Sequence, residues 1–412
     1  MLKKIRLTDF KSFVDEEVEL APLTLLVGAN ASGKSNFLDA IRFLQGLSLD
    51  LTLAEVLNGE ERGWPDRWPG IRGRAEEVAR FGTTSFTIES TWLAPGAELT
   101  SGKRIRLVPA QVPIRHRIVC SAPLALLESE ILASGSTGEP IFEAMPDPSG
   151  AARLKDHVDP SVPTQLVTNE KSLVSNLTGL AKLSALSSET IDFAAHFHDA
   201  FSEVRLLRME PSEMRGYGRR NTPLGEEGRN FSGVLATLSE DPMLKHSFIT
   251  WLREVCAPEI QELEFAEVKE LGDVIAMFVE KAGTRISVRA ISDGTLRFLG
   301  TLLALRTARP GEVLLIEEIE EGLHPTRIQF LLELLESTVR QRGIQVIATT
   351  HSPVVLQWLA PERLRETLVF GRIQDREGTV VRRLGELRDF EEVLQRLGIE
   401  ELFTTGWLEM AL

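Results

Sequence analysis

The spacing of apolar residues at the start of the chain predicts a strand, a glycine-rich turn and a helix in succession. Apolar and polar residues alternate over residues 5–10, and a mostly apolar run at 23–27 ends at Gly28. Both runs are typical of short β-strands. After residue 33 the apolar residues recur every three to four positions, which is the spacing of one helix face. The members of that face are Phe37, Ile41 and Leu44.

The middle of the chain mixes strand patterns with loops. Trp-Pro pairs within residues 50–80 predict a loop, and alternating runs from 83 to about 142 predict an antiparallel sheet. Residues 143–168 carry several prolines and are expected to form a loop or linker. Leucines three and four residues apart predict helices from 171 to about 207, a segment long enough for at most a short hairpin rather than a coiled-coil arm.

The second half of the chain ends in a regular pattern. We expect a polar, glycine-rich loop over 210–230, helices over 230–255 and strands over 259–290. From 313 to 350 the order is apolar strand, amphipathic helix, Gly343 and apolar strand. This order is a βαβ unit, which implies a parallel sheet.

Residues 28–35 spell a phosphate-binding loop, Gly-Ala-Asn-Ala-Ser-Gly-Lys-Ser, between a predicted strand and a predicted helix. The two glycines let the backbone curl so that its N–H groups point at phosphate oxygens, and the helix adds its positive end. We expect Lys34 to reach the outer phosphates and the Ser35 hydroxyl to hold Mg²⁺.

Two carboxylates and a histidine follow consecutive strands of the βαβ unit. Glu317 and Glu318 end the apolar run 313–316, which we expect to lie beside the phosphate-loop strand. Glu317 is then expected at the metal, and Glu318 at the attacking water as general base. His351 follows the next strand, where it can bond the terminal phosphate; taken in isolation these acids also fit a solvated strand end, and the histidine a structural role.

Ser292 and Gly294 stand just before an apolar helix expected from Thr295. A serine and a glycine at a helix N-terminus can bind an anion, but the same residues also form a common N-cap turn. Because these residues lie between the phosphate loop and the acids in the sequence, the anion-binding interpretation is favoured.

Composition and charge narrow the class of protein. The chain has 412 residues, and 46 Lys and Arg residues against 60 Asp and Glu residues give a formal charge of −14. This balance argues against a protein that coats nucleic acid over its whole surface, while leaving room for a local basic groove. We expect no signal peptide and no membrane span. The two separated cysteines, Cys120 and Cys256, exclude a cysteine zinc site and fit a reducing cytoplasm.

In the order of these motifs the chain resembles ABC-type ATPase heads, and in detail the RecF/SMC/OLD branch of AAA-type ATPases found beside DNA-repair and phage-defence genes. The resemblance runs from end to end and is thinnest over 50–205. The matching segments are Phe10–Phe13, Gly28–Asn36, Leu224–Asn230, Ser292–Arg297, Glu320–Pro325 and Gly398–Leu402.

The resemblance implies an ATP and Mg²⁺ site shared between two copies of the chain, a homodimer formed through ATP. Glu318, His351 and Lys34 are expected to be catalytic, and Ser35 and Glu317 to hold the metal. The partner copy is expected to supply Ser292 and Gly294 to the terminal phosphate, with Gly322–Pro325 at the same interface. The remaining nucleotide-binding residues of the loop are expected to be Gly28, Asn30, Ser32, Gly33 and Asn36.

Three residues depart from the family pattern. Glu317 stands where many members have Asp, which we expect to make hydrolysis slow or sensitive to the metal. Ala31 replaces a common Gly, and Thr295 stands where transporter cassettes usually have Gln. The metal-contacting Gln of the family is not placed, since Gln111 and Gln165 both remain possible.

The fold class implied is α/β: an ABC/SMC-head-like P-loop NTPase with a mixed parallel core sheet, an antiparallel β region and a helical subdomain. We expect an N-terminal ATPase half at 1–100, an inserted region at 101–206, a lobe leading to the signature at 207–290 and a C-terminal ATPase half at 291–412. No C-terminal nuclease domain is expected, because residues 352–412 are too few.

The sequence leaves the target open. A basic strip within 101–120 could contact DNA, but a solvated sheet face or a protein-binding surface is as good a reading. The strip consists of Lys103, Arg104, Arg106, Arg115 and Arg117, and a second cluster of Arg215, Arg219, Arg220 and Arg229 is equally ambiguous. The first hypothesis is a DNA-associated ATPase switch. The alternatives are a regulatory subunit that recruits a separate nuclease or toxin and, third, a transporter cassette.

Overall fold

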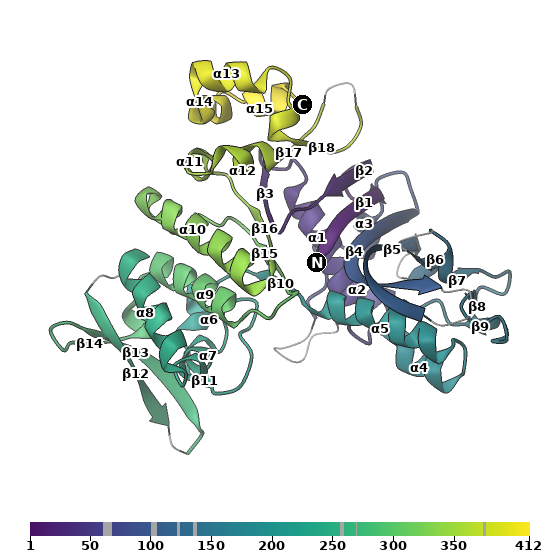
Figure 1. Cartoon of the computed structure of the whole chain (residues 1–412), viewed down its shortest axis with the longest axis horizontal. Helices are drawn as coiled ribbons and strands as arrows, with labels where there is room; N and C mark the ends of the chain where they lie inside the picture. Colours follow the sequence, from purple (N-terminus) through teal and green to yellow (C-terminus); the bar gives the residue numbers. More distant parts are fainter. Residues whose placement is uncertain are drawn as a thin grey trace.

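The computed structural model describes residues 1–60, 68–99, 105–121, 124–134, 138–255, 259–268, 270–373 and 376–412. It contains three sheets and the helices that cover them (Figure 1). The phosphate loop, the acids and the histidine all come from the central sheet, whose strands carry the labels β3, β10 and β15–β18 in Figure 1.

The central sheet has six strands in the order β10-β15-β16-β3-β17-β18. The first five run parallel, and β18 pairs antiparallel with β17. The strands are β10 (Val204–Leu207), β15 (Val313–Ile316), β16 (Gln345–Thr349), β3 (Leu23–Val27), β17 (Leu368–Gly371) and β18 (Val380–Arg383). The predicted βαβ unit and its parallel sheet are confirmed.

Two predictions about this sheet are wrong. The acid strand β15 does not lie beside the phosphate-loop strand β3, because β16 lies between them. Residues 204–207 are not the end of a helix but strand β10, whose Val204 pairs with Val313. A four-residue run with three apolar side chains fits either structure, and pairing with β15 decides it.

Helices cover both faces of the central sheet, as its alternating side chains require. Leu26 belongs to a core that includes α1 (Lys34–Gly46) and α5 (Ser188–Ser202). Leu25 and Val27 belong to a second core. Helices α9 (Asp293–Thr307) and α10 (Pro325–Arg342) contribute to that second core. The sheet is therefore fixed from both sides, and the ends of its strands are held in place.

The second sheet is antiparallel, has eight strands and follows the order β2-β1-β4-β5-β6-β7-β8-β9. Its strands are β1 (Leu2–Phe10), β2 (Phe13–Glu19), β4 (Ser85–Leu99), β5 (Ile105–Ser121), β6 (Leu124–Ala133), β7 (Pro140–Pro146), β8 (Ala152–Asp156) and β9 (Gln165–Val167). The predicted antiparallel region is confirmed. The loop predicted over 143–168 is wrong, since it holds β8 and β9; the prolines lie at strand ends and between strands.

The segment after β9 is helical, as predicted, until β10 begins. It contains the short 3-10 helix η1 (Val174–Asn176), α4 (Leu177–Lys182) and α5. Phe193, Phe197 and Phe201 of α5 are buried, and Phe201 packs near Trp92 of β4 with ring centroids 5.5 Å apart. These rings attach the helices to the antiparallel sheet.

The third sheet and its helices lead to the signature residues. It has four strands, β11 (Gly218–Arg219), β12 (Ile260–Val268), β13 (Asp273–Glu280) and β14 (Arg285–Ser287). Helices α7 (Phe231–Leu238) and α8 (Pro242–Val255) precede β12, and η2 (Val288–Ala290) precedes α9. The strands and helices predicted between 230 and 290 are confirmed, and the predicted helix from Thr295 begins two residues earlier.

Short helices complete the chain. Within the predicted loops, α2 (Leu53–Asn58) and α3 (Ala75–Val78) occupy part of 50–80, and α6 (Pro211–Met214) part of 210–230. After β16 come α11 (Pro353–Gln357), α12 (Pro361–Glu366), η3 (Leu384–Glu386), α13 (Phe390–Leu397), α14 (Ile399–Thr404) and α15 (Trp407–Met410). Among the described residues no helix combines the length and apolarity needed to cross a membrane.

Candidate nucleotide site

The phosphate loop has the backbone geometry that its glycines permit. Gly28 and Gly33 have φ of 149° and 110°, which L side chains rarely adopt. A Cβ on Gly28 would stand 2.2 Å from the carbonyl oxygen of Phe370, and one on Gly33 would stand 2.4 Å from Thr379 Oγ1. Ala31 also has a positive φ of 61°, so the position where the family often has glycine holds a non-glycine residue in the left-handed region.

Lys34 lies at the start of α1 with its charged end turned into the loop. Its side chain is buried, and Nζ donates hydrogen bonds to the carbonyl oxygens of Gly28 (2.7 Å) and Ala29 (2.8 Å). Burial lowers the pKa of Lys34 to about 8, against the opposing influence of Glu409 and Glu318. A triphosphate would give this ammonium group stronger acceptors than backbone carbonyls.

The remaining loop residues divide into exposed and anchored positions. Asn30 and Ser35 are exposed, whereas Ser32 is buried and its hydroxyl accepts from Lys34 Nζ at 3.3 Å. Asn36 Nδ2 donates to Ser12 Oγ at 2.9 Å, and the Thr379 hydroxyl donates to the same oxygen. The segment 10–13 therefore packs against the phosphate loop, which gives a physical reason for its place in the motif set.

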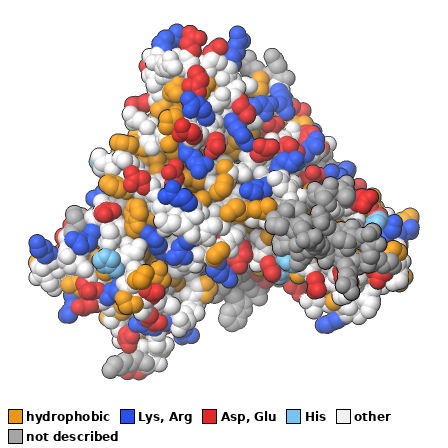
Figure 2. Space-filling model, in the orientation of Figure 1, with side chains coloured by type: hydrophobic (Ala, Val, Ile, Leu, Met, Phe, Trp, Pro, Cys, Tyr) orange, Lys and Arg blue, Asp and Glu red, His pale blue; other side chains and the backbone are white. Residues whose placement is uncertain are grey.

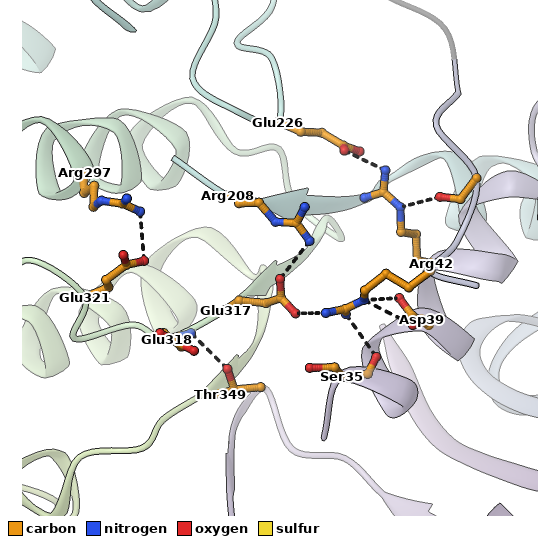
Figure 3. A network of polar contacts seen from close by, with 12 residues as sticks. Ser35, Asp39, Arg42, Arg208, Glu226, Arg297, Glu317, Glu318, Glu321 and Thr349 are labelled. Carbon is orange, nitrogen blue, oxygen red and sulfur yellow. Dashed lines mark hydrogen bonds and ion pairs between the residues drawn. The ribbon is translucent and has the colours of Figure 1, made fainter. Parts of the chain in front are cut away.

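Glu317 lies at the carboxyl end of β15 between two arginines, one of them Arg208 (Figure 3). Its carboxylate contacts Arg72 Nη1 at 2.8 Å and Arg208 Nη2 at 3.0 Å. Burial by itself raises the pKa of Glu317, but the two guanidinium groups outweigh it and hold the pKa below its usual value. Glu317 is therefore a carboxylate at neutral pH.

Arg72 connects the acid strand to the phosphate-loop helix. Besides Glu317, it contacts the Ser35 carbonyl oxygen at 3.1 Å and the buried Asp39 carboxylate at 3.1 Å. One guanidinium thus reaches both residues predicted to hold the metal. Sequence analysis did not identify Arg72 or Arg208 as site residues, and nothing in their local sequence distinguishes them from surface arginines.

Glu318 and His351 follow the neighbouring strands β15 and β16 at the carboxyl end of the central sheet. Glu318 is exposed on a strained backbone with φ of 48°, and its N–H donates to Thr349 Oγ1 at 2.9 Å (Figure 3). The His351 N–H donates to Glu320 Oε1 at 2.8 Å. Burial, and then the nearby Lys34 charge, lower the pKa of His351, so its ring is neutral at pH 7.

The signature residues line a separate cavity. Ser292 caps α9 by accepting from the Thr295 N–H at 3.3 Å. Gly294 touches the turn after the acids: a Cβ on it would stand 1.9 Å from the Gly322 carbonyl oxygen. The cavity, of about 480 Å³, is lined by Ser292, Gly294, Thr295, Gly322, Leu323, His324, Thr326 and Arg327. The signature and the segment 322–325 are therefore together, and no residue of the phosphate loop lines this cavity.

The donors near the phosphate loop suit Mg²⁺ and a triphosphate. The Ser35 hydroxyl and the Glu317 carboxylate are hard oxygen ligands, and one arginine side chain spans the gap between their residues. Among the described residues there is no cluster of three or more His, Cys, Asp or Glu able to hold a metal. The two oxygen donors of Ser35 and Glu317 fit Mg²⁺, which usually takes its other ligands from phosphate and water.

The basic clusters noted in the sequence are largely ion-paired. Arg115 contacts Glu89 and Arg117 contacts Glu128, while Lys103, Arg104 and the side chain of Arg106 lie outside the described residues. In the second cluster Arg215 pairs with Asp293, Arg219 with Asp273, Arg220 with Glu240 and Glu267, and Arg229 with Glu213. Figure 2 shows the same mixture over one face, where basic and acidic side chains are interspersed. Neither cluster forms a free cationic surface in the part of the chain that is described.

Comparison with known proteins finds similarity to ATPases over parts of the chain. Residues 169–357 match a family described as "AAA domain, putative AbiEii toxin, Type IV TA system", and residues 1–66 match the family "AAA ATPase domain". The DNA replication and repair protein RecF of Synechocystis is 44% identical over 95 residues, which are 21% of this chain and 25% of that protein. The chain thus spans about a quarter of the length of this curated relative.

Two solved structures of low sequence identity are also matched along most of the chain. An SMC head bound to the C-terminal winged-helix domain of ScpA is 14% identical, covers 93% of this chain and 99% of its own, and has a TM-score of 0.48. The SMC head of Thermotoga maritima is 13% identical, covers 93% and 98%, and has a TM-score of 0.41. The family matches and the RecF segment confirm the resemblance to RecF/SMC-type AAA ATPases. The parallel central sheet, with the phosphate loop between β3 and α1, agrees with the P-loop fold expected from the motifs.

Proposed function

We propose that this RecF/SMC-type chain binds ATP with Mg²⁺, that two copies close around the nucleotide, and that hydrolysis reopens them. One observation carries the proposal: the signature cavity is separate from the phosphate loop of the same chain. A nucleotide on the phosphate loop therefore meets a signature only if a second copy supplies it. Binding energy then drives closure, and loss of the terminal phosphate removes the contact.

Within one copy, each residue of the site has a separate proposed role. The loop backbone from Gly28 to Gly33, with Asn30, Ser32 and Asn36, cradles the phosphates, and Lys34 neutralises their charge. Ser35 and Glu317 would hold a Mg²⁺ ion, which would supply positive charge beside the phosphate oxygens. The ion pairs of Glu317 with Arg72 and Arg208 support this role, because they keep the carboxylate ionised.

Glu318 is the proposed general base. Its exposed carboxylate stands on a strained backbone held by Thr349, and such strain is common at functional positions. It takes a proton from the water that attacks the terminal phosphorus atom. His351, whose neutral form is favoured by burial and the nearby Lys34, is the residue that we assign to a terminal phosphate oxygen. Ser292 and Gly294 of the partner copy contact the same phosphate from the opposite side.

The site of action is proposed to be DNA, in repair or phage defence. The support is the 95-residue similarity to a protein named for DNA replication and repair. The regulatory alternative, a subunit that recruits a separate nuclease or toxin, is favoured by the description of the family matched over 169–357. Turnover with and without duplex DNA separates the two, since only the first expects DNA to change the rate or the dimerisation.

The molecular mass of the protein in solution tests whether two copies associate through ATP. Light scattering of Glu318→Gln with and without ATP and Mg²⁺ should show a monomer that becomes a dimer only with both. Lys34→Ala in the same background is the matched control and should remain monomeric. A Glu318→Gln protein that stays monomeric at saturating ATP would contradict the shared site.

A further inference from the structure

Arg327 is a signature-cavity residue to which the motif pattern gives no role. It belongs to the first turn of α10, is half-buried, and lines the cavity of about 480 Å³ together with Ser292 and Gly294. Arg327 therefore lies on the wall that, in the proposed dimer, faces the nucleotide of the other copy.

Arg327 has no acidic partner among the residues that the structure describes. Over the described residues no hydrogen bond or ion pair involves its side chain, whereas two arginines that contact acids beside the cavity residues are paired. Arg297 contacts Glu321 at 2.8 Å, and Arg215 contacts Asp293 at 2.6 Å. The acids nearest to the cavity in the sequence are thus taken by other arginines, and Arg327 remains available for an anion from outside.

The backbone around the cavity also favours the binding of an anion. Helices α9 and α10 both begin there, capped by Ser292 and His324. The positive ends of two long helices favour an anion in the same space. A guanidinium matches phosphate oxygens with parallel hydrogen bonds, which a lone ammonium group cannot reproduce.

We propose that Arg327 binds the terminal phosphates of the ATP held by the partner copy's phosphate loop. The proposal rests on the proposed function, since it requires a nucleotide shared between copies. It adds a cation acting in trans to the serine and the glycine of the signature, and it makes closure depend on a residue outside the recognised motifs.

The first test measures association in the Glu318→Gln background, by light scattering over a titration of ATP with Mg²⁺. Loss of a charged hydrogen-bond partner in Arg327→Ala should raise the ATP concentration for half-maximal dimerisation roughly tenfold to a hundredfold. Arg327→Lys keeps the charge and should recover part of the loss. Arg340→Ala, on the exposed face of the same helix, is the matched control and should behave as the parent.

The second test asks which copy the arginine serves. A Lys34→Ala copy mixed with an Arg327→Ala copy, one of them carrying an affinity tag, retains one complete shared site if Arg327 acts in trans. The tagged copy should then capture the untagged one with ATP more strongly than either variant associates with itself. The double variant Lys34→Ala/Arg327→Ala mixed with the parent has no complete site and should associate weakly.

The outcomes separate the two proposals. If the parent dimerises with ATP but Arg327→Ala dimerises equally well, the role of Arg327 is wrong and the proposed function stands. If the double variant with the parent associates well and the two single variants do not, Arg327 acts on its own copy's nucleotide and the trans assignment is overturned. If the parent itself never dimerises with ATP, both proposals fail.

Discussion

Replacing Gly294 with alanine tests the contact between the signature and the turn after the acids. Gly294 is the second residue of α9, and the structure gives it no positive φ that would require glycine. Alanine is the better helix former, by about 0.5–1 kcal/mol. Helix propensity therefore predicts that Gly294→Ala stabilises the protein.

The packing predicts the opposite sign. The added Cβ would stand 1.9 Å from the Gly322 carbonyl oxygen and 2.9 Å from its carbon, both backbone atoms. An ordinary carbon–oxygen contact is roughly 3.3 Å, so the two segments must separate by about 1.4 Å. Displacing packed backbone by that much costs typically about 1–3 kcal/mol, which exceeds the helix gain. We expect a net loss of about 1–2 kcal/mol in local stability.

Hydrogen exchange measured by mass spectrometry follows this local effect. Amides in 291–297 and 320–326 should exchange about tenfold faster in Gly294→Ala, because about 1.4 kcal/mol corresponds to a factor of ten. Gly179→Ala in α4 is the control, since its Cβ meets only the end of the flexible Asn176 side chain. Equal or stronger protection of these segments in Gly294→Ala would refute the steric argument.

Other predictions concern the chemistry of the site. Lys34→Ala should abolish ATP-dependent dimerisation, because no other cation replaces it in the loop; unchanged ATP affinity by calorimetry would count against the site. The affinity of the parent for ATP should be constant below pH 8 and fall above it, since Lys34 has a pKa of about 8 in the free protein and must be protonated to pair with phosphate. Calorimetry in two buffers of different ionisation enthalpy should show proton uptake above pH 8, and a flat profile up to pH 9.5 would exclude this linkage. Glu318→Gln should lower turnover roughly 100-fold or more while ATP stays bound, and wild-type turnover would move the base elsewhere. Glu317→Asp shortens the side chain proposed to bind the metal and should change the ratio of the hydrolysis rates with Mg²⁺ and Mn²⁺; an identical ratio would show that the extra methylene is without effect.

Much of the fold near the phosphate loop could be predicted from local pattern. The strand–loop–helix around Gly28 and Lys34 and the βαβ unit ending at 349 depend on periodicities and glycines within about 40 residues, which the sequence displays directly. The errors fall where short apolar runs are ambiguous. Three strands are defined by the strands they pair with rather than by their own sequence: β10, β8 (152–156) and β9 (165–167). The division into four segments and the role of each site residue stay predictions.

What the sequence determined by itself is a set of motifs in a fixed order: a phosphate loop, a serine before a helix, two carboxylates after a strand and a histidine after the next strand. The phosphate loop is distinctive in isolation because its glycines, lysine and serine lie within eight residues, whereas the other motifs gain their meaning from the order. What only the tertiary structure decided is the arrangement among distant segments. The order of β15, β16 and β3, the arginines that join Glu317 to the phosphate-loop helix, and the contact of Gly294 with Gly322 all pair residues far apart in the chain. The position of Arg327 is also a matter of tertiary structure. That it lines the signature cavity without an acidic partner among the described residues can be recognised only after the surrounding carboxylates have been located. Such pairings arise from packing on a common sheet, and no local period encodes them.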